Sequence, residues 1–465
     1  MPLNNFILYR RLITERFSSK TLAFSLRISF SALMLASASH VSLGQASLFG
    51  SLDDPSEQLS ISRWRPLTTF EGGAGFSLVG PQWYSAATLD FSRRATPTYL
   101  HLAGMVRTGV YGAYAPDIDE FYDVIRLVRA ARYLSPTGGR YVRIGPLSRT
   151  RLGSGHLVNF LNTDAAEDAR TVGVEARLSS SVLAFEGFSE NVTTLGLVGA
   201  RLSFQPFSSM DSPLSTLSVS ASVVSDQKVR LTKKSPVDGQ EVGIRMQAYT
   251  TGGFSFNPFV NLARIPDYGQ GMVIGADIDN DNFIDLARLH FRLALHYNSS
   301  DFRSGYFGSF YTVNSQRARV VSEDESQRAG YDLRAIERGN SVETELRMYI
   351  FNRFEFWYAF LRYHGVQPLS EYHLRLRFAS NRFNVSIGQD RAGLVGFISL
   401  FESLGDENRL RFEFEYRIYG PLWTRFIADY TYVGIGDPNA AIPQYIVQRR
   451  FSPILSLRYP SSQPK

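Results

Sequence analysis

The residues best suited to chemistry in this sequence are arginines and glutamates that recur at every second position. Between positions 409 and 417, Arg409, Arg411, Glu413, Glu415 and Arg417 alternate with apolar side chains. A period of two places such residues on one face of a β-strand. Opposed rows of guanidinium and carboxylate groups set an electric field and a preference among ions. The same alternation elsewhere adds Arg245, Arg292, Arg347, Arg375 and Arg377.

A second chemical pattern is an acidic run of nine residues that contains Asp277, Asp279, Asp281 and Asp285. Oxygen side chains at positions one, three, five and nine of a tight turn can converge on a hard cation such as calcium. The spacing resembles that of EF-hand and dockerin-type loops, but Arg288 stands where the bidentate glutamate belongs. Two interpretations stay open, a calcium site and a solvated turn rich in Asp and Asn, and the solvated turn is the more common of the two.

Other catalytic chemistry finds little support in the sequence. The absence of cysteine excludes disulfides, thiolate metal sites and catalytic thiols. None of the seven histidines lies in a recognisable nucleophile or protease motif. The net charge is +6, but five basic residues and one acidic residue fall within positions 1–44, so the remainder is too nearly neutral to indicate nucleic-acid binding. We predict that the protein is not an enzyme.

The elements that must position these side chains are strands of about ten residues. Leu289–Tyr297, Tyr372–Phe378 and Arg409–Tyr419 show the alternation most clearly, and aromatic residues make up 13% of the chain. Ten residues is the length that a tilted strand needs to cross a bilayer. Further strands are predicted at 61–70, 84–93, 98–107, 171–178, 181–189, 194–205, 215–224, 242–249, 254–264, 302–313, 342–350, 354–363, 383–389, 395–402, 422–433 and 447–459.

These strands predict an all-β protein, a closed antiparallel transmembrane β-barrel whose apolar face meets lipid and whose polar face meets a lumen. A soluble β-sandwich would alternate in the same way, but long aromatic strands favour the barrel. Closure also removes the exposed sheet edges that lipid would not tolerate. The strand number should be even, and we expect about 16, within a range of 14 to 18.

The first 44 residues have the character of a signal peptide. Basic residues precede an apolar run from Ile28 to Ala36, and small residues at Ala36–Ala38 and Ser42–Gly44 offer cleavage sites. The apolar run is too short to span a bilayer as a helix. We therefore expect residues 45–465 to form the barrel domain in the outer membrane.

Two stretches break the alternation and predict an insertion at 118–163, in the lumen or at the rim. Residues 116–134 have apolar side chains at helical spacing, which indicates one short amphipathic helix near 118–134. Arg126, Arg129 and Arg132 would line a constriction if this helix lay in the lumen. Residues 141–163 indicate a bent strand or an inward-folded segment, and Gly153–Gly155 within it indicates a turn rather than a phosphate site.

These features resemble Gram-negative outer-membrane β-barrel proteins of the porin-like kind, although they identify no specific family. The resemblance rests on the export signal, the alternating strands and the final segment Phe451–Tyr459, after which Pro460–Lys465 follow. In such proteins the outer-membrane insertion machinery recognises a final strand that ends in an aromatic residue. The resemblance implies that the lipid bilayer and this machinery are partners.

The function favoured by a charge-lined lumen is passage of small hydrophilic solutes as a channel or transporter. Two alternatives remain open at this stage. The charged residues could pair from wall to wall and leave a structural or adhesive barrel without an open pore, or the barrel could carry an outer-membrane hydrolase site. The pattern specifies neither the solute nor the oligomeric state.

Overall fold

The computed structural model describes residues 68–95, 97–133, 140–168, 170–227, 237–283, 286–313, 333, 336–351, 353–364, 369–395, 398–399, 407–435 and 444–460. The expected signal peptide at 1–44 lies outside these residues, as does Asp285. Within them, no helix has both the length and the apolar character needed to cross a membrane.

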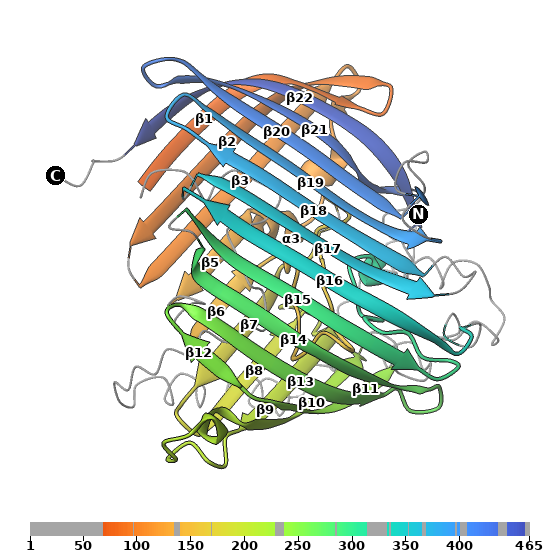
Figure 1. The fold of residues 1–465 in the computed structure, drawn as a ribbon. Coiled ribbons are helices and arrows are strands. Elements are labelled where there is room, and N and C mark those ends of the chain that lie inside the picture. Colours follow the sequence, from red (N-terminus) through yellow and green to blue (C-terminus); the bar gives the residue numbers. More distant parts are fainter. Residues whose placement is uncertain are drawn as a thin grey trace, which may run out of the picture. The chain divides into compact units, whose positions relative to one another are not determined.

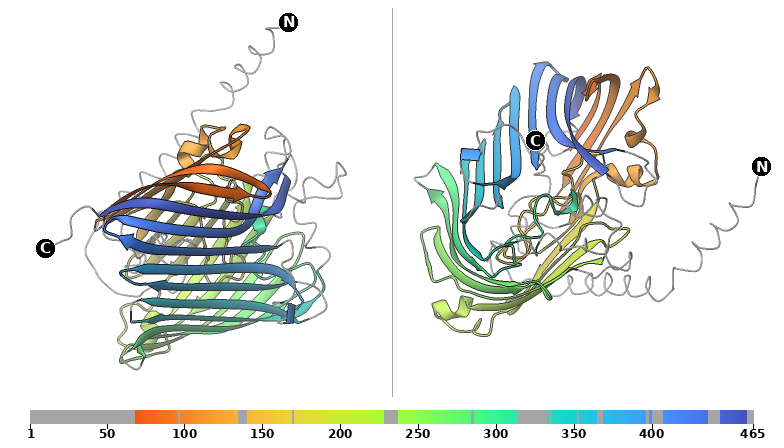
Figure 2. Two further views of the ribbon diagram at one scale, coloured as in Figure 1. Left: turned by 90° about the horizontal axis from the view of Figure 1, so that it is seen from above. Right: turned by 90° about the vertical axis from the view of Figure 1, so that its right-hand side faces the viewer.

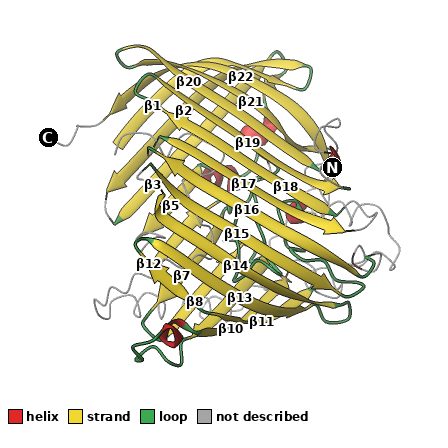
Figure 3. Ribbon diagram, in the orientation of Figure 1, coloured by secondary structure: helices red, strands yellow, loops and turns green. Residues whose placement is uncertain are grey.

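Strands form most of the described chain, as Figures 1 and 3 show. They are β1 (Thr68–Val79), β2 (Gln82–Ala95), β3 (Thr98–Gly109), β4 (Gly112–Ala113), β5 (Val128–Tyr133), β6 (Tyr141–Gly145), β7 (Gly173–Ser179), β8 (Leu183–Ser189), β9 (Leu197–Phe204), β10 (Ser218–Asp226), β11 (Asp238–Arg245), β12 (Tyr249–Thr251), β13 (Phe254–Arg264), β14 (Gln270–Phe283), β15 (Ala287–Asn298), β16 (Gly339–Ile350), β17 (Phe354–His364), β18 (Ser370–Ala379), β19 (Phe383–Leu394), β20 (Asn408–Tyr419), β21 (Leu422–Ile435) and β22 (Gln444–Pro460). The helices whose bounds lie within the described residues are the α-helix α3 (Tyr122–Arg126) and the short 3-10 helices η2 (Ala115–Asp117) and η4 (Pro213–Thr216).

The strands close into one antiparallel barrel. Each pairs with its neighbour in the sequence, and β1 pairs with β22 to complete the circle. The short β4 and β12 share a neighbour with β5 and β11, so the wall has 20 strands. The expected fold class is confirmed, but the expected number of about 16 strands is too low. Regular alternation is weak in β5 and β14, which the sequence did not predict as strands, and β6 falls within 141–163, for which a bent strand was one of two interpretations.

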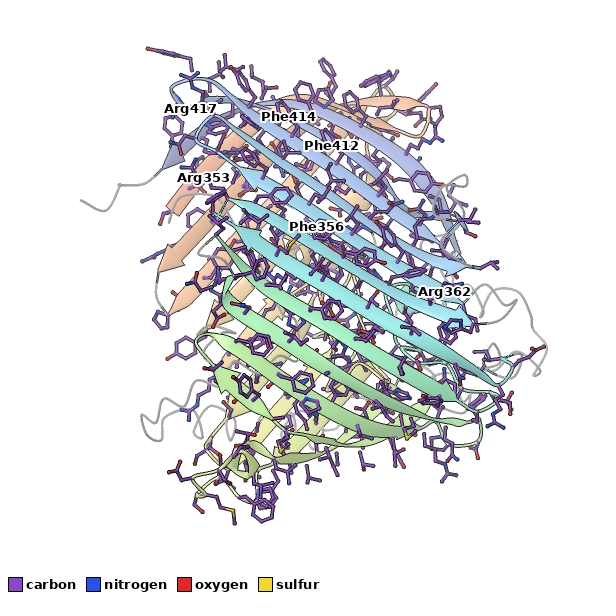
Figure 4. The ribbon with its side chains drawn as sticks, in the orientation of Figure 1. Arg353, Phe356, Arg362, Phe412, Phe414 and Arg417 are labelled. Carbon is purple, nitrogen blue, oxygen red and sulfur yellow. The ribbon has the colours of Figure 1, made fainter. Side chains whose placement is uncertain are left out.

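The two faces of the wall follow the predicted alternation. Outward residues are apolar and exposed, as Leu293 on β15 and Phe412 on β20 illustrate with exposed fractions of 44% and 38%. Figure 4 shows Phe356, Phe412 and Phe414 on the outer surface. Inward residues are polar and buried, so the apolar outside suits lipid and the inside is a polar lumen. The closed barrel with this outer surface is that of an outer-membrane protein.

The two ends of the barrel differ in the length of their connections. At one end the turns are short, for example between β16 and β17 or between β18 and β19, and at the other end lie the long connections 146–172 and 299–338. In barrels of this class the long loops face the extracellular side. Figure 4 places Arg353 and Arg417 at the short-turn end and Arg362 toward the long-connection end.

The seam between β1 and β22 is interrupted. Pairing runs from Thr69↔Pro460 to Gly75↔Ile454, skips two residues, and resumes at Leu78↔Phe451. Pro453 lies at the gap and has no N–H to donate to the ladder. A side chain at Gly75 would collide with the Pro453 carbonyl oxygen, so only glycine allows this approach.

The wall also changes character after β3. Pairing of β3 with β5 ends at Leu102↔Val128, pairing with β4 occupies only Thr108 and Gly109, and residues 114–127 fill the interval. We call residues 114–127 the side lobe. It contains η2 and α3 and bulges from the wall in Figure 2.

The predicted helix near 118–134 is therefore largely wrong. Only 122–126 are α-helical, and Val128–Tyr133 form β5 instead. The helical spacing of apolar residues in this stretch is real but short, and Val128 to Tyr133 gain ladder hydrogen bonds with β3 and β6 that an isolated helix could not offer.

Two long connections fold into the interior, where they form most of the apolar core. We call residues 146–172 the first inner segment and residues 299–313 the second inner segment. Leu157 and Val158 from the first pack with Phe302 and Phe307 from the second, and Val158 pairs with Phe307 in a parallel bridge. The strand predicted at 302–313 is wrong, because these aromatic residues pack against the first inner segment rather than against lipid.

Candidate solute passage in the barrel interior

Buried ion pairs attach the first inner segment to the wall. Arg151 donates to Glu343 and Glu345 on β16, at 3.0 and 2.7 Å. On another part of the wall, Arg409 of β20 forms an ion pair with Asp164. Removing one partner of a buried pair leaves an uncompensated charge, which is strongly destabilising. These contacts fix the segment across the lumen.

A cavity of about 150 Å³ remains beside the first inner segment. It lies between that segment, the side lobe and the strands β2, β3 and β20–β22. Basic and acidic groups line it in nearly equal numbers. The basic ones are His101, Arg107, Arg126, Arg129, Arg170, Arg409, Arg411, Arg425 and Arg450, and the acidic ones are Asp90, Asp117, Asp123, Asp164, Glu167, Asp168 and Asp429.

Asp168 and Glu167 of the first inner segment organise the charge in this cavity. Asp168 accepts hydrogen bonds from Arg107 of β3 at 3.1 Å and from Arg450 of β22 at 2.9 Å. Glu167 accepts one from Arg129 of β5 at 3.0 Å. Burial would raise the pKa of both carboxyls, but the surrounding arginines hold each pKa below its usual range. Both groups are therefore anions that draw arginines from three strands toward the cavity.

A pair of stacked histidines lies where the two inner segments meet the wall. The rings of His156 and His296 have centroids 5.3 Å apart, and their Nδ1 atoms are 3.3 Å apart. Phe302 stacks on His156 from the second inner segment. The Nε2 atom of His296 lies 3.2 Å from Glu343 on β16, and Arg292 of β15 also faces this group.

Acid should weaken the contact between the first inner segment and the wall at His156 and His296. Burial first, and then the electrostatic effect of the neighbouring His296, lower the pKa of His156 well below its ordinary value. A detached segment would return the pKa of His156 to about 6.5, so the detached state binds more protons and seating weakens as pH falls below about 6.5. We expect channel fluctuations to increase between pH 7 and pH 5 in bilayer recordings. His156→Phe should remove this response, and an unchanged pH profile in that variant would contradict the assignment.

Nine of the ten charged residues predicted for the lumen point inward. Most of them form ion pairs with groups on neighbouring strands, for example Arg375 with Asp390 at 2.8 Å and Arg347 with Glu355 at 3.0 Å. Arg417 is the exception, because it is exposed beside the short turn and donates to the Gly420 carbonyl at 2.7 Å. The inward residues are Arg245, Arg292, Arg347, Arg375, Arg377, Arg409, Arg411, Glu413 and Glu415.

The three arginines predicted for a constriction helix do not share a helix. Arg126 ends α3, whereas Arg129 and Arg132 belong to β5. Arg126 and Arg129 nevertheless line the cavity, and Arg126 donates to the Arg170 carbonyl of the first inner segment at 3.2 Å. Arg132 lies over the Tyr99 ring instead, 5.7 Å from its centroid.

The predicted acidic turn is also wrong in its backbone. Asp277, Asp279 and Asp281 belong to β14, where alternation spreads same-face carboxylates along a strand. Asp277 is fully buried and forms ion pairs with Arg245 and Arg292, and Asp279 contacts His290 at 2.8 Å. For Asp277, the two arginines thus supply the positive charge expected from a cation. Calcium binding stays a prediction, with Asp285 outside the described residues.

Sequence reasoning missed the residues that shape the cavity. Asp168 and Glu167 lie in an irregular segment, Arg107 lies near the end of β3, and Arg450 lies within β22, where periodicity gives no reason to single it out. The one available signal was the density of charged residues in Asp164–Arg170, which contains four ionisable groups among small residues. Only the folded arrangement brings them opposite β3 and β22.

Comparisons with known proteins return structural likenesses only. No family model matches the chain, and no curated protein is similar to it in sequence. Similar solved structures include the outer membrane protein opdK from Pseudomonas aeruginosa, with 9% identity, a TM-score of 0.32, and 84% of this chain and 98% of that chain covered. OccAB3 from Acinetobacter baumannii has 10% identity, a TM-score of 0.31 and the same coverage. OccK10 (OpdN) from Pseudomonas aeruginosa has 10% identity, a TM-score of 0.32, and 86% of this chain and all of that chain covered.

Proposed function

We propose that the barrel passes small hydrophilic solutes through the charge-lined cavity beside the first inner segment. The observation that carries the proposal is the cavity itself, which is lined by guanidinium and carboxylate groups in near balance. Charged side chains at a constriction select among ions and offer hydrogen bonds in place of water. If the interior only filled the barrel, we would expect tight packing there and no cavity surrounded by guanidinium and carboxylate groups.

The test is conductance of the purified protein in a planar bilayer. Discrete conductance steps are expected from the unmodified protein. Arg129→Gln removes a positive charge from the cavity, so the reversal potential in a salt gradient should shift toward cations. Arg353→Gln, at the short-turn rim, is the matched control and should leave the reversal potential nearly unchanged. Equal shifts in both variants would place the selective region outside the cavity.

A barrel without an open pore is the second candidate, and one observation favours it. The first inner segment is held to β16 and to β20 by buried ion pairs and packs against the second inner segment. If protein that has folded and inserted shows no conductance at any pH, the structural role is the better assignment.

A further inference from the structure

The hydrogen-bonding edge of β3 has no strand partner over Ala103–Arg107. The Ala103 N–H donates to the Leu127 carbonyl at one end of this interval, and at the other end the Arg107 N–H donates to the Asp117 carboxylate. Open sheet edges are not tolerated against lipid, and irregular backbone occurs at membrane depth only where protein buries it or it lines a water-filled cavity. The interval should therefore border a cavity.

The cavity described above does reach this interval. Asp90 and Arg107 line it from the inward face of β2 and β3. Gly104 and Leu127, which lie on the two sides of the unpaired interval, line it as well. An opening in the wall from the lumen toward the bilayer would therefore lie at this break in the ladder.

The side lobe covers this opening with apolar side chains. Ile118, Phe121 and Val124 are exposed by 64%, 81% and 58%, which suits contact with lipid chains. Leu127 provides the covering contact at β3, since a Cβ atom placed on Gly104 would lie 2.6 Å from its Cδ2 atom. On the inner side of the lobe, Asp123 and Arg126 face the cavity.

We propose that this opening is a lateral portal that admits small amphiphiles with an anionic head group from the lipid into the cavity. The apolar part would lie between the side lobe and Gly104, and the head group would enter the cavity. Among the described residues, the buried Nε atoms of Arg170, Arg409 and Arg450 have no hydrogen-bond acceptor. An anionic head group supplies such acceptors. The portal lies in the half of β3 nearer the long connections, which face the extracellular side in barrels of this class.

The proposal goes beyond passage of hydrophilic solutes along the lumen. Two sulfonates distinguish entry through the portal from passage along the lumen. Octanesulfonate is an amphiphile with a permanent charge, whereas ethanesulfonate has the same head group and almost no apolar part. The cysteine-free chain allows a disulfide between Gly104→Cys and Leu127→Cys to lock the side lobe to β3. In proteoliposomes, oxidation of this variant should reduce octanesulfonate entry to the level of protein-free vesicles and leave ethanesulfonate entry unchanged. Reduction should restore octanesulfonate entry.

The matched control is Val260→Cys with Ile274→Cys, two outward residues paired across the continuous ladder of β13 and β14. This disulfide should affect neither sulfonate. Leu127→Ala removes the covering side chain without a cross-link and should raise octanesulfonate entry alone. Octanesulfonate entry that is equal in the locked and reduced forms would overturn the portal, whereas failure of ethanesulfonate to enter in every form would instead overturn the proposed function.

Discussion

Replacing residues 147–171 with a short Gly-Ser linker is expected to raise single-channel conductance several-fold. The first inner segment fills the lumen and carries Arg151, Asp164, Glu167 and Asp168 into it. Barrels of 16 to 18 strands already leave an aqueous channel when nothing occupies them, and this wall has 20 strands. The measurement is the conductance histogram in a planar bilayer.

A single substitution tests whether the first inner segment blocks the lumen without the risk that a deletion prevents folding. Arg151→Met removes the arginine that pairs with Glu345 and leaves Glu343 with Arg292 as its remaining arginine partner, so it should destabilise seating of the segment by about 3–5 kcal/mol. We expect frequent transitions between the low conductance of the unmodified protein and the high conductance of the deletion. A deletion variant with unmodified conductance would show that the first inner segment does not limit flow.

Leu293→Arg is expected to cost about 2–4 kcal/mol in folding into lipid vesicles, because it places a charge on the lipid face near the middle of β15. Leu293 is 44% exposed on the outer surface, and its neighbour Arg292 is fully buried on the inner one. The measurement is the free energy of unfolding from vesicles in a denaturant titration.

Two variants control for this substitution. Leu293→Gln changes the same position without adding charge and should cost less than Leu293→Arg. Arg411→Leu, on the inward face of β20, should cost less than Leu293→Arg, because Arg409 also compensates Asp429, and it should alter ion preference, since Arg411 lies 3.3 Å from Asp429 beside the cavity. Equal losses of stability from Leu293→Arg and Arg411→Leu would mean that the two faces of the wall are not distinct.

The sequence predicted the wall well because alternation is a local signal. Segments such as Arg409–Tyr419 bury one face and expose the other, and their register follows from that pattern alone. Prediction failed where tertiary contacts outweigh the local pattern. Asp277 and Asp279 suggested a turn, yet they occupy a strand, where Arg245 and Arg292 compensate the charge of Asp277 and His290 contacts Asp279.

The interior was less predictable than the wall. Phe302 and Phe307 are apolar and aromatic like strand residues, and nothing in their spacing indicates that their partners are Leu157 and Val158, which lie about 150 positions earlier. Likewise Asp168 accepts a hydrogen bond from Arg450, which is 282 residues away in the sequence. Contacts between residues so far apart in the sequence form only when the whole barrel closes. The periodicity of a single segment therefore cannot predict them.

The seam between β1 and β22 has a mechanical consequence. It contains 9 paired positions with a gap at Pro453, whereas β21 and β22 share 14 consecutive pairs. Under tension around the circumference of the wall, this seam would part at a lower force than the β21–β22 boundary. The ruptured form would be a single curved sheet held at one edge by β22, with the Arg458–Glu71 pair among the first contacts to part.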